Sequence, residues 1–314
     1  MRATLTQLYA ATSWSHAWTN QDGWLDPAIP VCQWHGVSCS ADNSTLTALD
    51  LPRNYLASDG CIDLTPIFAQ LPDLETLNLG QNVLLCLSSL DLRRHSRLRS
   101  LTLAGLNSAA GHLLVLPDSS RLVHLDLSLS SWSFNLSSSM PLLETLSLNG
   151  LKQPFDLSTI SASPSSALSV LRLEAVDLRG TLADLCPLPN LSLLTTDHAR
   201  LTSALPLDVA ACWPNIVTLH LCCSNLNGPL PSFSRLPKLF DLRQSRPHAH
   251  AGRVRAIEIA RLILFLFVLC VCVCFFAVLH CFRAELQQNQ LGGSISFDFV
   301  ADSPLMFAIN LAQK

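Results

Sequence analysis

Cysteine and histidine are the residues of this sequence whose side-chain chemistry stands out first. His220, Cys222 and Cys223 lie close together, and imidazole and thiolate groups are the common protein ligands of zinc. A structural zinc site needs further ligands, and no second cluster of ligands follows nearby. We therefore expect a surface cluster or structural thiols at these positions, and no metal site.

Motifs that mark common enzymes are absent from the sequence. It contains no G-x-x-x-x-G-K-S/T, G-x-G-x-x-G, G-x-S-x-G or H-E-x-x-H pattern. With a net charge of -3 and a pI of about 6.3, the chain also lacks the basic field that attracts phosphates. We expect no catalytic residues, no cofactor and no nucleic-acid partner.

A repeat of the form L-x-x-L-x-L-x-x-N-x-L runs through most of the chain. Residues 46–56 and 74–84 match it completely. Further repeats start at Leu98, Leu122, Leu143, Leu168, Leu191, Ile216 and Leu239. Successive starts lie 21 to 28 residues apart, within the range of about 20–29 that is typical of leucine-rich repeats. The pattern predicts an α/β repeat solenoid, a horseshoe with short parallel strands on its concave face.

Each repeat contributes one coil to a shared core. The L-x-L segment predicts a short strand whose two leucines face inward, because side chains alternate along a strand. One coil cannot bury its own leucines, whereas stacked coils form a continuous core. The Asn side chain of the repeat template is expected to form hydrogen bonds with the backbone of the bend that follows it. We expect less regular turns where another residue takes its place, at Leu106, Ser130, Leu151, Val176, Ala199 and Ser224.

Residues 1–45 are rich in tryptophan and do not follow the repeat. They contain the residues Leu8 to Thr12, Trp18, Asn20, Gly23 and Trp24, followed by the element C-x-W-x-G-V-x-C from Cys32 to Cys39. This segment resembles the N-terminal cap of plant-type leucine-rich repeat proteins, a family that includes receptor-like kinase ectodomains and secreted enzyme-inhibitor proteins. The resemblance implies a helical cap over the open end of the solenoid and a disulfide between Cys32 and Cys39. Two thiols in a cytosolic cap are the alternative.

Cysteines, short motifs and sequons in the repeats are further indications of the cellular compartment of the protein. Cys186 and Cys212 occupy similar places on successive coils, where they form either a bridge or two buried thiols. The scattered Cys61 and Cys86 are expected to be small buried hydrophobes. Residues 226–231 and 291–295 resemble the L-x-G-x-I-P element of plant leucine-rich repeats, and residues 178–182 match it in part. Three sequons make Asn43, Asn135 and Asn190 candidates for glycosylation.

Both ends of the sequence are abrupt. No apolar signal segment precedes the cap. Met306, Ile309 and Leu311 have the spacing of a tenth repeat, which the last residue interrupts. We therefore expect the natural protein to extend beyond one or both ends, or to be cytosolic.

An apolar run from Leu262 to Phe282 is long enough to cross a bilayer. Five arginines precede this run and one follows it closely, so the positive-inside rule would place the repeats in the cytoplasm. This orientation conflicts with a disulfide-bonded cap. The run therefore predicts a single-pass membrane protein of uncertain topology, or is not part of the mature protein.

The run also interrupts a repeat. Leu239 to Arg243 begin the ninth repeat, and its continuation, L-Q-Q-N-Q-L, appears only from Leu286. Removing residues 244–285 joins the halves in register. Insertions favour loops over strand interiors. We therefore expect four regions: a cap (1–45), repeats (46–243), an insert of translated intron or membrane sequence (244–285), and the end of the ninth repeat with the start of a tenth (286–314).

The polar strand positions of the repeats predict the binding surface. On the concave face they carry both signs of charge and no aromatic residue, at Asp50, Arg53, Glu75, Arg99, His124, Asp126, Glu144, Arg172, Glu174, Asp197, His198 and His220. Eight of these, from His124 onward, are the binding candidates. The expected partner is a protein or peptide, with a glycan as another possibility. The predicted function is a non-enzymatic recognition module of a receptor-like or secreted protein; an intracellular scaffold is the alternative.

Overall fold

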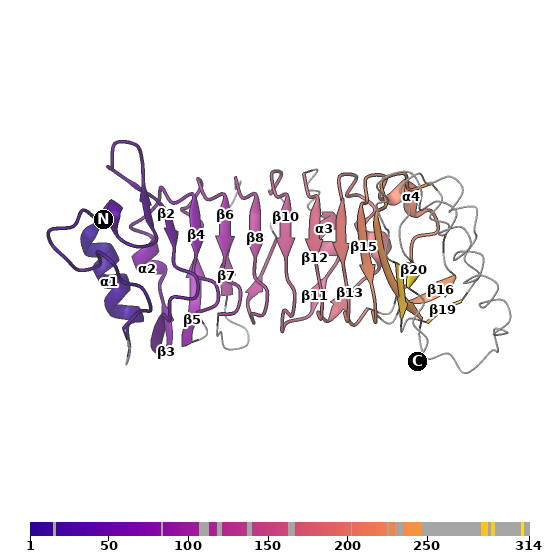
Figure 1. Cartoon of the computed structure of the whole chain (residues 1–314), viewed down its shortest axis with the longest axis horizontal. Coiled ribbons are helices and arrows are strands. Elements are labelled where there is room, and N and C mark those ends of the chain that lie inside the picture. The colour runs from indigo at the N-terminus through magenta and orange to yellow at the C-terminus, as the bar shows by residue number, and fades with distance from the viewer. Residues whose placement is uncertain are drawn as a thin grey trace, which may run out of the picture.

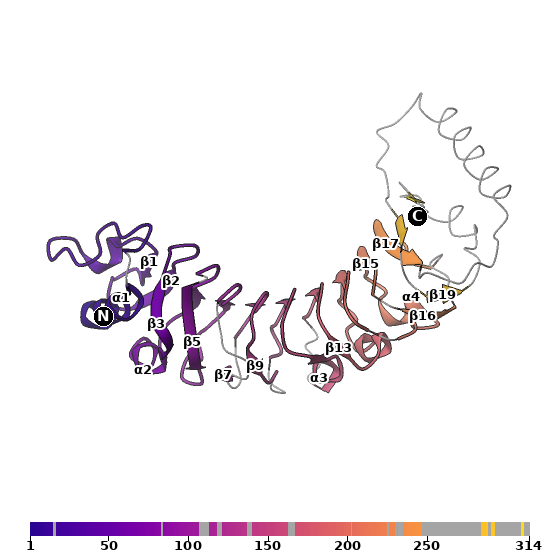
Figure 2. The same cartoon turned by 90° about the horizontal axis from the view of Figure 1, so that it is seen from below.

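The computed structural model describes most of the first 246 residues and three short segments beyond them. The described residues are 1–246, apart from 15–16, 83, 107–112, 118–120, 137–139, 163–166, 202, 225, 230 and 232–234, together with 284–287, 290–292 and 309–310. They form an elongated, curved solenoid with the cap at one end (Figures 1 and 2). The curvature confirms the predicted horseshoe architecture.

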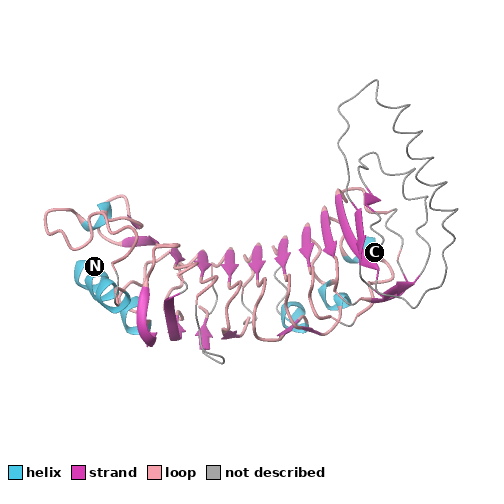
Figure 3. Ribbon diagram, turned by 60° about the horizontal axis from the view of Figure 1, so that its bottom comes forward, coloured by secondary structure: helices cyan, strands magenta, loops and turns pink. Residues whose placement is uncertain are grey.

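A 12-stranded sheet lines the concave side of the curve (Figures 2 and 3). Its strands are parallel except for the first pair. In spatial order they are β1 (Val37–Cys39), β2 (Leu46–Asp50), β4 (Thr76–Asn78), β6 (Ser100–Thr102), β8 (His124–Asp126), β10 (Thr145–Ser147), β12 (Val170–Arg172), β14 (Leu193–Thr195), β15 (Thr218–Leu221), β17 (Asp241–Arg246), β18 (Ala284–Gln287) and β20 (Ile309–Asn310).

The inward leucines of these strands form one core that runs along the solenoid. Leu49, Leu77, Leu101 and Leu125 are each 0% exposed and lie in register on successive strands. The repeat starts are buried too, from Leu46 at 3% to Leu239 at 3%. Each coil therefore buries its leucines against its neighbours, which is the reason a single repeat cannot fold alone.

The convex side carries strands as well as short helices, which the repeat pattern did not predict. A 4-stranded sheet is formed by β3 (Ala57–Asp63), β5 (Leu84–Asp91), β7 (Leu113–Val115) and β9 (Ser133–Phe134). Two pairs follow, β11 (Phe155–Asp156) with β13 (Leu178–Arg179) and β16 (Asn227–Pro229) with β19 (Gln290–Gly292). The helical elements are α2 (Thr65–Phe68), α3 (Ser158–Ala162), α4 (Val209–Cys212) and a 3-10 turn at Leu182–Leu185.

A left-handed residue follows the strand in each of the first eight coils. Its φ lies between 51° and 68° at Arg53, Gln81, Gly105, Leu129, Gly150, Ala175, His198 and Cys223. From Arg53 to His198, its N–H donates to a carbonyl of the next coil at 2.6–2.9 Å. The expectation of less regular turns without Asn was therefore wrong for the backbone. The hydrogen bond between coils accompanies the same turn whether or not Asn follows.

Among the described residues, the Asn side chains of the repeat strengthen the first two turns. Asn82 is 1% exposed and bonds four backbone groups of its own and the preceding coil. Asn54 accepts a hydrogen bond from the N–H of Asn20 and donates to its carbonyl, so it ties the cap to the first coil. In later coils, apolar residues such as Leu106 and Leu151 fill the same buried position.

The cap covers the N-terminal end of the core. Its helix α1 (Arg2–Thr12) buries Leu5 and Leu8 completely. Trp24 lies between two other indole rings, with centroids 4.6 Å from Trp18 and 4.9 Å from Trp34. A short 3-10 turn (Val31–Gln33) leads into β1. Because β1 pairs antiparallel with β2, the cap supplies the first strand of the long sheet and pairs the edge that the first repeat would otherwise leave open.

The C-terminal end of the long sheet contains both parts of the interrupted ninth repeat. β17 extends to Arg246, and Ala284–Gln287 form the separate strand β18 beside it. Residues 247–283 lie outside the described residues, and so does the candidate membrane span from Leu262 to Phe282. Within the described part of the chain, no helix is long and apolar enough to cross a bilayer. The intron hypothesis therefore stays a prediction.

Candidate functional site

The polar positions between the inward leucines form one continuous column on the concave sheet. Backbone pairing places them in register from strand to strand, as Asp50, Asn78, Thr102, Asp126, Ser147, Arg172, Thr195 and His220. Neighbouring strands in a sheet are about 4.8 Å apart. The column is therefore a regular row of polar groups that crosses the coils. Ser147 and Thr195 in it are buried, at 8% and 4% exposure, and the other six side chains are at least partly exposed.

The eight binding candidates spread over this face without converging on one point. Asp126, Arg172 and His220 belong to the column. The others lie beside it, at the strand ends or turns of the same coils: His124, Glu144, Glu174, Asp197 and His198. His124, Glu144 and His198 are exposed, and the remaining five are partly exposed. These eight side chains are therefore distributed along the concave face and are not gathered at one point.

Two of the candidate carboxylates accept hydrogen bonds from the backbone, one in its own turn and one in the next coil. Asp126 Oδ1 accepts a hydrogen bond from the N–H of Ser128 at 3.0 Å. Asp197 Oδ1 accepts one from the N–H of Cys222 in the next coil at 2.7 Å. Both carboxylates therefore have a structural role in addition to any contact with a ligand.

An imidazole–carboxylate pair marks the far end of the column. His220 Nε2 lies 2.8 Å from Asp241 Oδ2, and the two side chains are 14% and 22% exposed. Asp241 lies two positions before Arg243, the register partner of His220 on the next strand, so the contact is diagonal between coils. Sequence spacing alone did not identify this partner.

Apolar side chains lie beside the polar row at its C-terminal end, which corrects the expectation that this face has no aromatic residue. Val217 is 37% exposed and Phe240 is 43% exposed. They occupy the second position of successive repeats, and the N–H of Phe240 donates to the carbonyl of Val217. The second position of the repeat carries exposed side chains, so an aromatic residue at that position was the sequence signal that could have identified Phe240.

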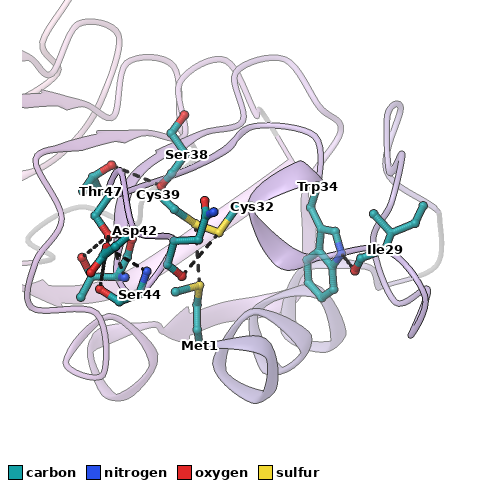
Figure 4. The surroundings of a disulfide bond; sticks show 12 residues. Met1, Ile29, Cys32, Trp34, Ser38, Cys39, Asp42, Ser44 and Thr47 are labelled. Carbon is teal, nitrogen blue, oxygen red and sulfur yellow. Dashed lines mark hydrogen bonds between the residues drawn. A yellow bond between two sulfur atoms is a disulfide. The ribbon is translucent and has the colours of Figure 1, made fainter.

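The cap disulfide between Cys32 and Cys39 is present and joins the 3-10 turn to β1 (Figure 4). Two further disulfides join successive coils. One is Cys186–Cys212, for which the sequence left a bridge or two thiols open. The other is Cys61–Cys86, which corrects the expectation of scattered buried thiols. In both pairs the cysteines stand 25 or 26 residues apart, the length of one coil, and that spacing was the missed signal.

The three candidate glycosylation sites lie on the surface of the solenoid. Asn43, Asn135 and Asn190 are all exposed. Ser137, the third residue of the second sequon, lies outside the described residues.

Among the residues that the structure describes, no group of three His, Cys, Asp or Glu side chains is placed to hold a metal ion. His220, Cys222 and Cys223 therefore do not form such a group.

The turn that carries the first sequon also holds a strongly acidic carboxyl group. Hydrogen bonds from Ser40 and Ser44 lower the pKa of Asp42 from 3.8 to about 2 (Figure 4). A lowered pKa means that the folded turn favours the charged carboxylate. The stabilisation is therefore present above the unfolded pKa and is lost as pH falls through about 2.

We expect carbon-detected NMR titration of the carboxyl groups to give Asp42 the lowest midpoint in this turn. Exchanging both Ser40 and Ser44 for alanine removes the two hydroxyl donors and leaves the backbone N–H of Ser44, so the midpoint should rise from about 2 toward 3.8. A midpoint that stays near 2 in that variant would show that other groups hold the charge.

Comparison with known proteins places the architecture. No family model matches the chain, and no curated protein matches it. Among solved structures, a plant ice-binding protein superposes with a TM-score of 0.52 at 17% identity, over 76% of this chain and 82% of that one. A leucine-rich repeat protein of Leptospira interrogans superposes with a TM-score of 0.52 at 18% identity, over 85% of this chain and 62% of that one.

This chain has the leucine-rich repeat fold. The inward leucines, the parallel concave sheet and the similarity to a leucine-rich repeat structure agree on this point. At these identities the similarities establish the fold alone, because one fold can serve many functions. The function of the leucine-rich repeat surface has to be argued from its own residues.

Proposed function

We propose that this chain is a non-enzymatic recognition module that binds a protein or peptide along its concave sheet. The observation that carries the proposal is the in-register polar column from Asp50 to His220, flanked by exposed charged side chains. Concave solenoid faces are extended surfaces that suit extended partners.

The chemistry of the surface indicates the kind of partner. Glu144 and His124 are exposed on neighbouring coils, and Arg172 follows on the next strand of the column. Alternating hydrogen-bonding and charged groups match the backbone and polar side chains of an extended peptide. Near the C-terminal end, Val217 and Phe240 add an apolar area where one hydrophobic side chain of the peptide can dock.

The disulfides support an oxidising compartment for this module. Cys32–Cys39, Cys61–Cys86 and Cys186–Cys212 are all paired. Stable disulfides are rare in the cytosol, where thiols are kept reduced. We therefore place the repeats in the secretory pathway or outside the cell, as part of a receptor-like or secreted protein.

Selection from a displayed library of random peptides, with the full chain as bait, tests the proposal. We expect enriched peptides whose binding weakens about fivefold or more in the double variant His124→Ala/Glu144→Ala, because truncating a central contact costs more than about 1 kcal/mol. Affinity is read by fluorescence anisotropy at several salt concentrations, and charged contacts should weaken as salt rises.

The matched control is Asp59→Ala, an exposed carboxylate on β3 of the convex sheet. This variant should bind the selected peptides as the parent chain does. Equal losses in both variants, or no enrichment above that of an unrelated bait, would contradict binding on the concave sheet.

A further inference from the structure

Cys222 and Cys223 are adjacent in the chain, and their sulfur atoms lie 2.9 Å apart just after β15. Both side chains are partly exposed at the edge of the concave sheet. The backbone around them is fixed. The N–H of Cys222 donates to Asp197, its carbonyl accepts from the N–H of His198, and Cys223 has a φ of 59°. The turn therefore holds the backbone of the two adjacent cysteines in place, and their sulfur atoms lie in contact there.

The other cysteines of the described residues are all in disulfides: Cys32, Cys39, Cys61, Cys86, Cys186 and Cys212. A chain with this pattern matures where disulfide oxidants are present. In that setting, two partly exposed thiols in contact meet the first requirement for thiol–disulfide exchange, which is access.

We propose that Cys222 and Cys223 form a thiol–disulfide exchange site whose substrates are low-molecular-weight disulfides such as oxidised glutathione. One cysteine thiolate attacks a sulfur of the substrate, the disulfide of the substrate breaks, and one glutathione leaves as its thiol. The second cysteine attacks the resulting mixed disulfide and releases the second glutathione. The two protons of the cysteine thiols end on the two glutathione thiols, and the protein gains a vicinal disulfide.

The vicinal disulfide should be reduced more easily than the other three. The Cα atoms of neighbouring residues are at most about 3.8 Å apart. The Cα atoms of the three existing disulfides are 4.3 to 5.6 Å apart. Shorter spans strain a disulfide and make it easier to reduce. The site is therefore a reversible modification at the edge of the concave sheet, and it does not depend on the identity of a ligand.

Equilibrating the full chain in glutathione buffers of increasing reducing strength tests this proposal. After acid quenching and alkylation, mass spectrometry measures the peptide that contains Cys222 and Cys223. We expect this peptide to lack two hydrogens and carry no alkyl group in oxidising buffer. It should become doubly alkylated at a ratio of reduced to oxidised glutathione at least about tenfold lower than the ratio that opens the other disulfides.

The variant Cys223→Ser provides the control, because Cys222 alone can only keep a mixed disulfide with glutathione. If this variant fails to fold, the titration of the unmodified chain still decides the question. Double alkylation in the most oxidising buffer, a stable glutathione adduct on one cysteine of the unmodified chain, a disulfide between two chains, or joint opening with the other three disulfides would each overturn the proposal.

Discussion

Replacing Gly36 with alanine is expected to weaken the attachment of the cap to the first coil by about 2–5 kcal/mol. An added Cβ atom would lie 2.3 Å from the carbonyl oxygen of Asp50 and 2.7 Å from Leu51 Cδ2. The residue has a φ of 73°, a conformation that costs any L side chain about 1–2 kcal/mol. Because the closest atom belongs to the backbone of β2, β1 and β2 must move apart.

The clash also threatens a specific hydrogen bond. The N–H of Asp50 donates to the carbonyl of Gly36 at 2.7 Å, next to the register pair Val37 and Leu49. Separating the strands would therefore expose the first layer of leucines to water. The glycine of the C-x-W-x-G-V-x-C element is thus required by close contact between the cap and the solenoid.

Gly60→Ala is the matched control for this prediction. Gly60 has a φ of 71°, and a Cβ atom added there meets no atom within 4 Å. It should cost only the conformational penalty of about 1–2 kcal/mol. Urea unfolding followed by tryptophan fluorescence reports on the cap, because four of the six tryptophans lie in residues 1–45. Equal losses in the two variants would show that the contact at Gly36 has no special role.

Asn82→Ala should destabilise the second coil by about 3–5 kcal/mol. Asn82 Nδ2 donates to the carbonyls of Leu51 and Leu79 at 2.8 and 2.7 Å. Its Oδ1 accepts from the N–H groups of Asn54 and Leu56 at 2.9 and 3.1 Å. Alanine leaves these buried groups without this partner, and each unsatisfied group costs about 1–3 kcal/mol before the turn relaxes.

Asn215→Ala is the corresponding control for an asparagine outside the core. Asn215 also joins neighbouring coils. Its Nδ2 donates to the carbonyl of Pro189 at 2.9 Å and its Oδ1 accepts from Lys238 Nζ at 2.6 Å, and both bonds are exposed. Water can replace them, so the loss should stay below about 1 kcal/mol. Hydrogen exchange of the amides near Leu56 should accelerate in Asn82→Ala and not in Asn215→Ala. Unchanged exchange in both variants would contradict the role of Asn82.

The leucine period was sufficient to predict the coils because burial repeats with the sequence. Each inward leucine must face the core, so the positions of the concave strands follow from the pattern. The resemblance of the cap to those of plant-type leucine-rich repeat proteins implied the bridge from Cys32 to Cys39, which the structure shows. Local patterns of this kind express requirements that each coil or motif meets by itself.

Several features that depend on two coils were not predicted, although the Cys186–Cys212 bridge was one of two possibilities that the sequence left open. Leu129 and Ala175 adopt a left-handed backbone because their N–H groups bond the next coil, although neither residue type favours that conformation. The contact of His220 with Asp241 and the disulfide of Cys61 have the same origin, since each partner belongs to a neighbouring coil. Stacking, and not local propensity, decides these features.

Cross-linking of a selected peptide to the full chain tests the central claim most directly. The peptide carries a photoreactive group, and mass spectrometry locates the residues to which it attaches. The account predicts attachment to the concave strands between β6 and β17, on residues in and beside the column that contains Asp126, Arg172 and His220. Attachment concentrated on the convex strands β3, β5, β7 and β9, or on the cap, would contradict a concave recognition surface.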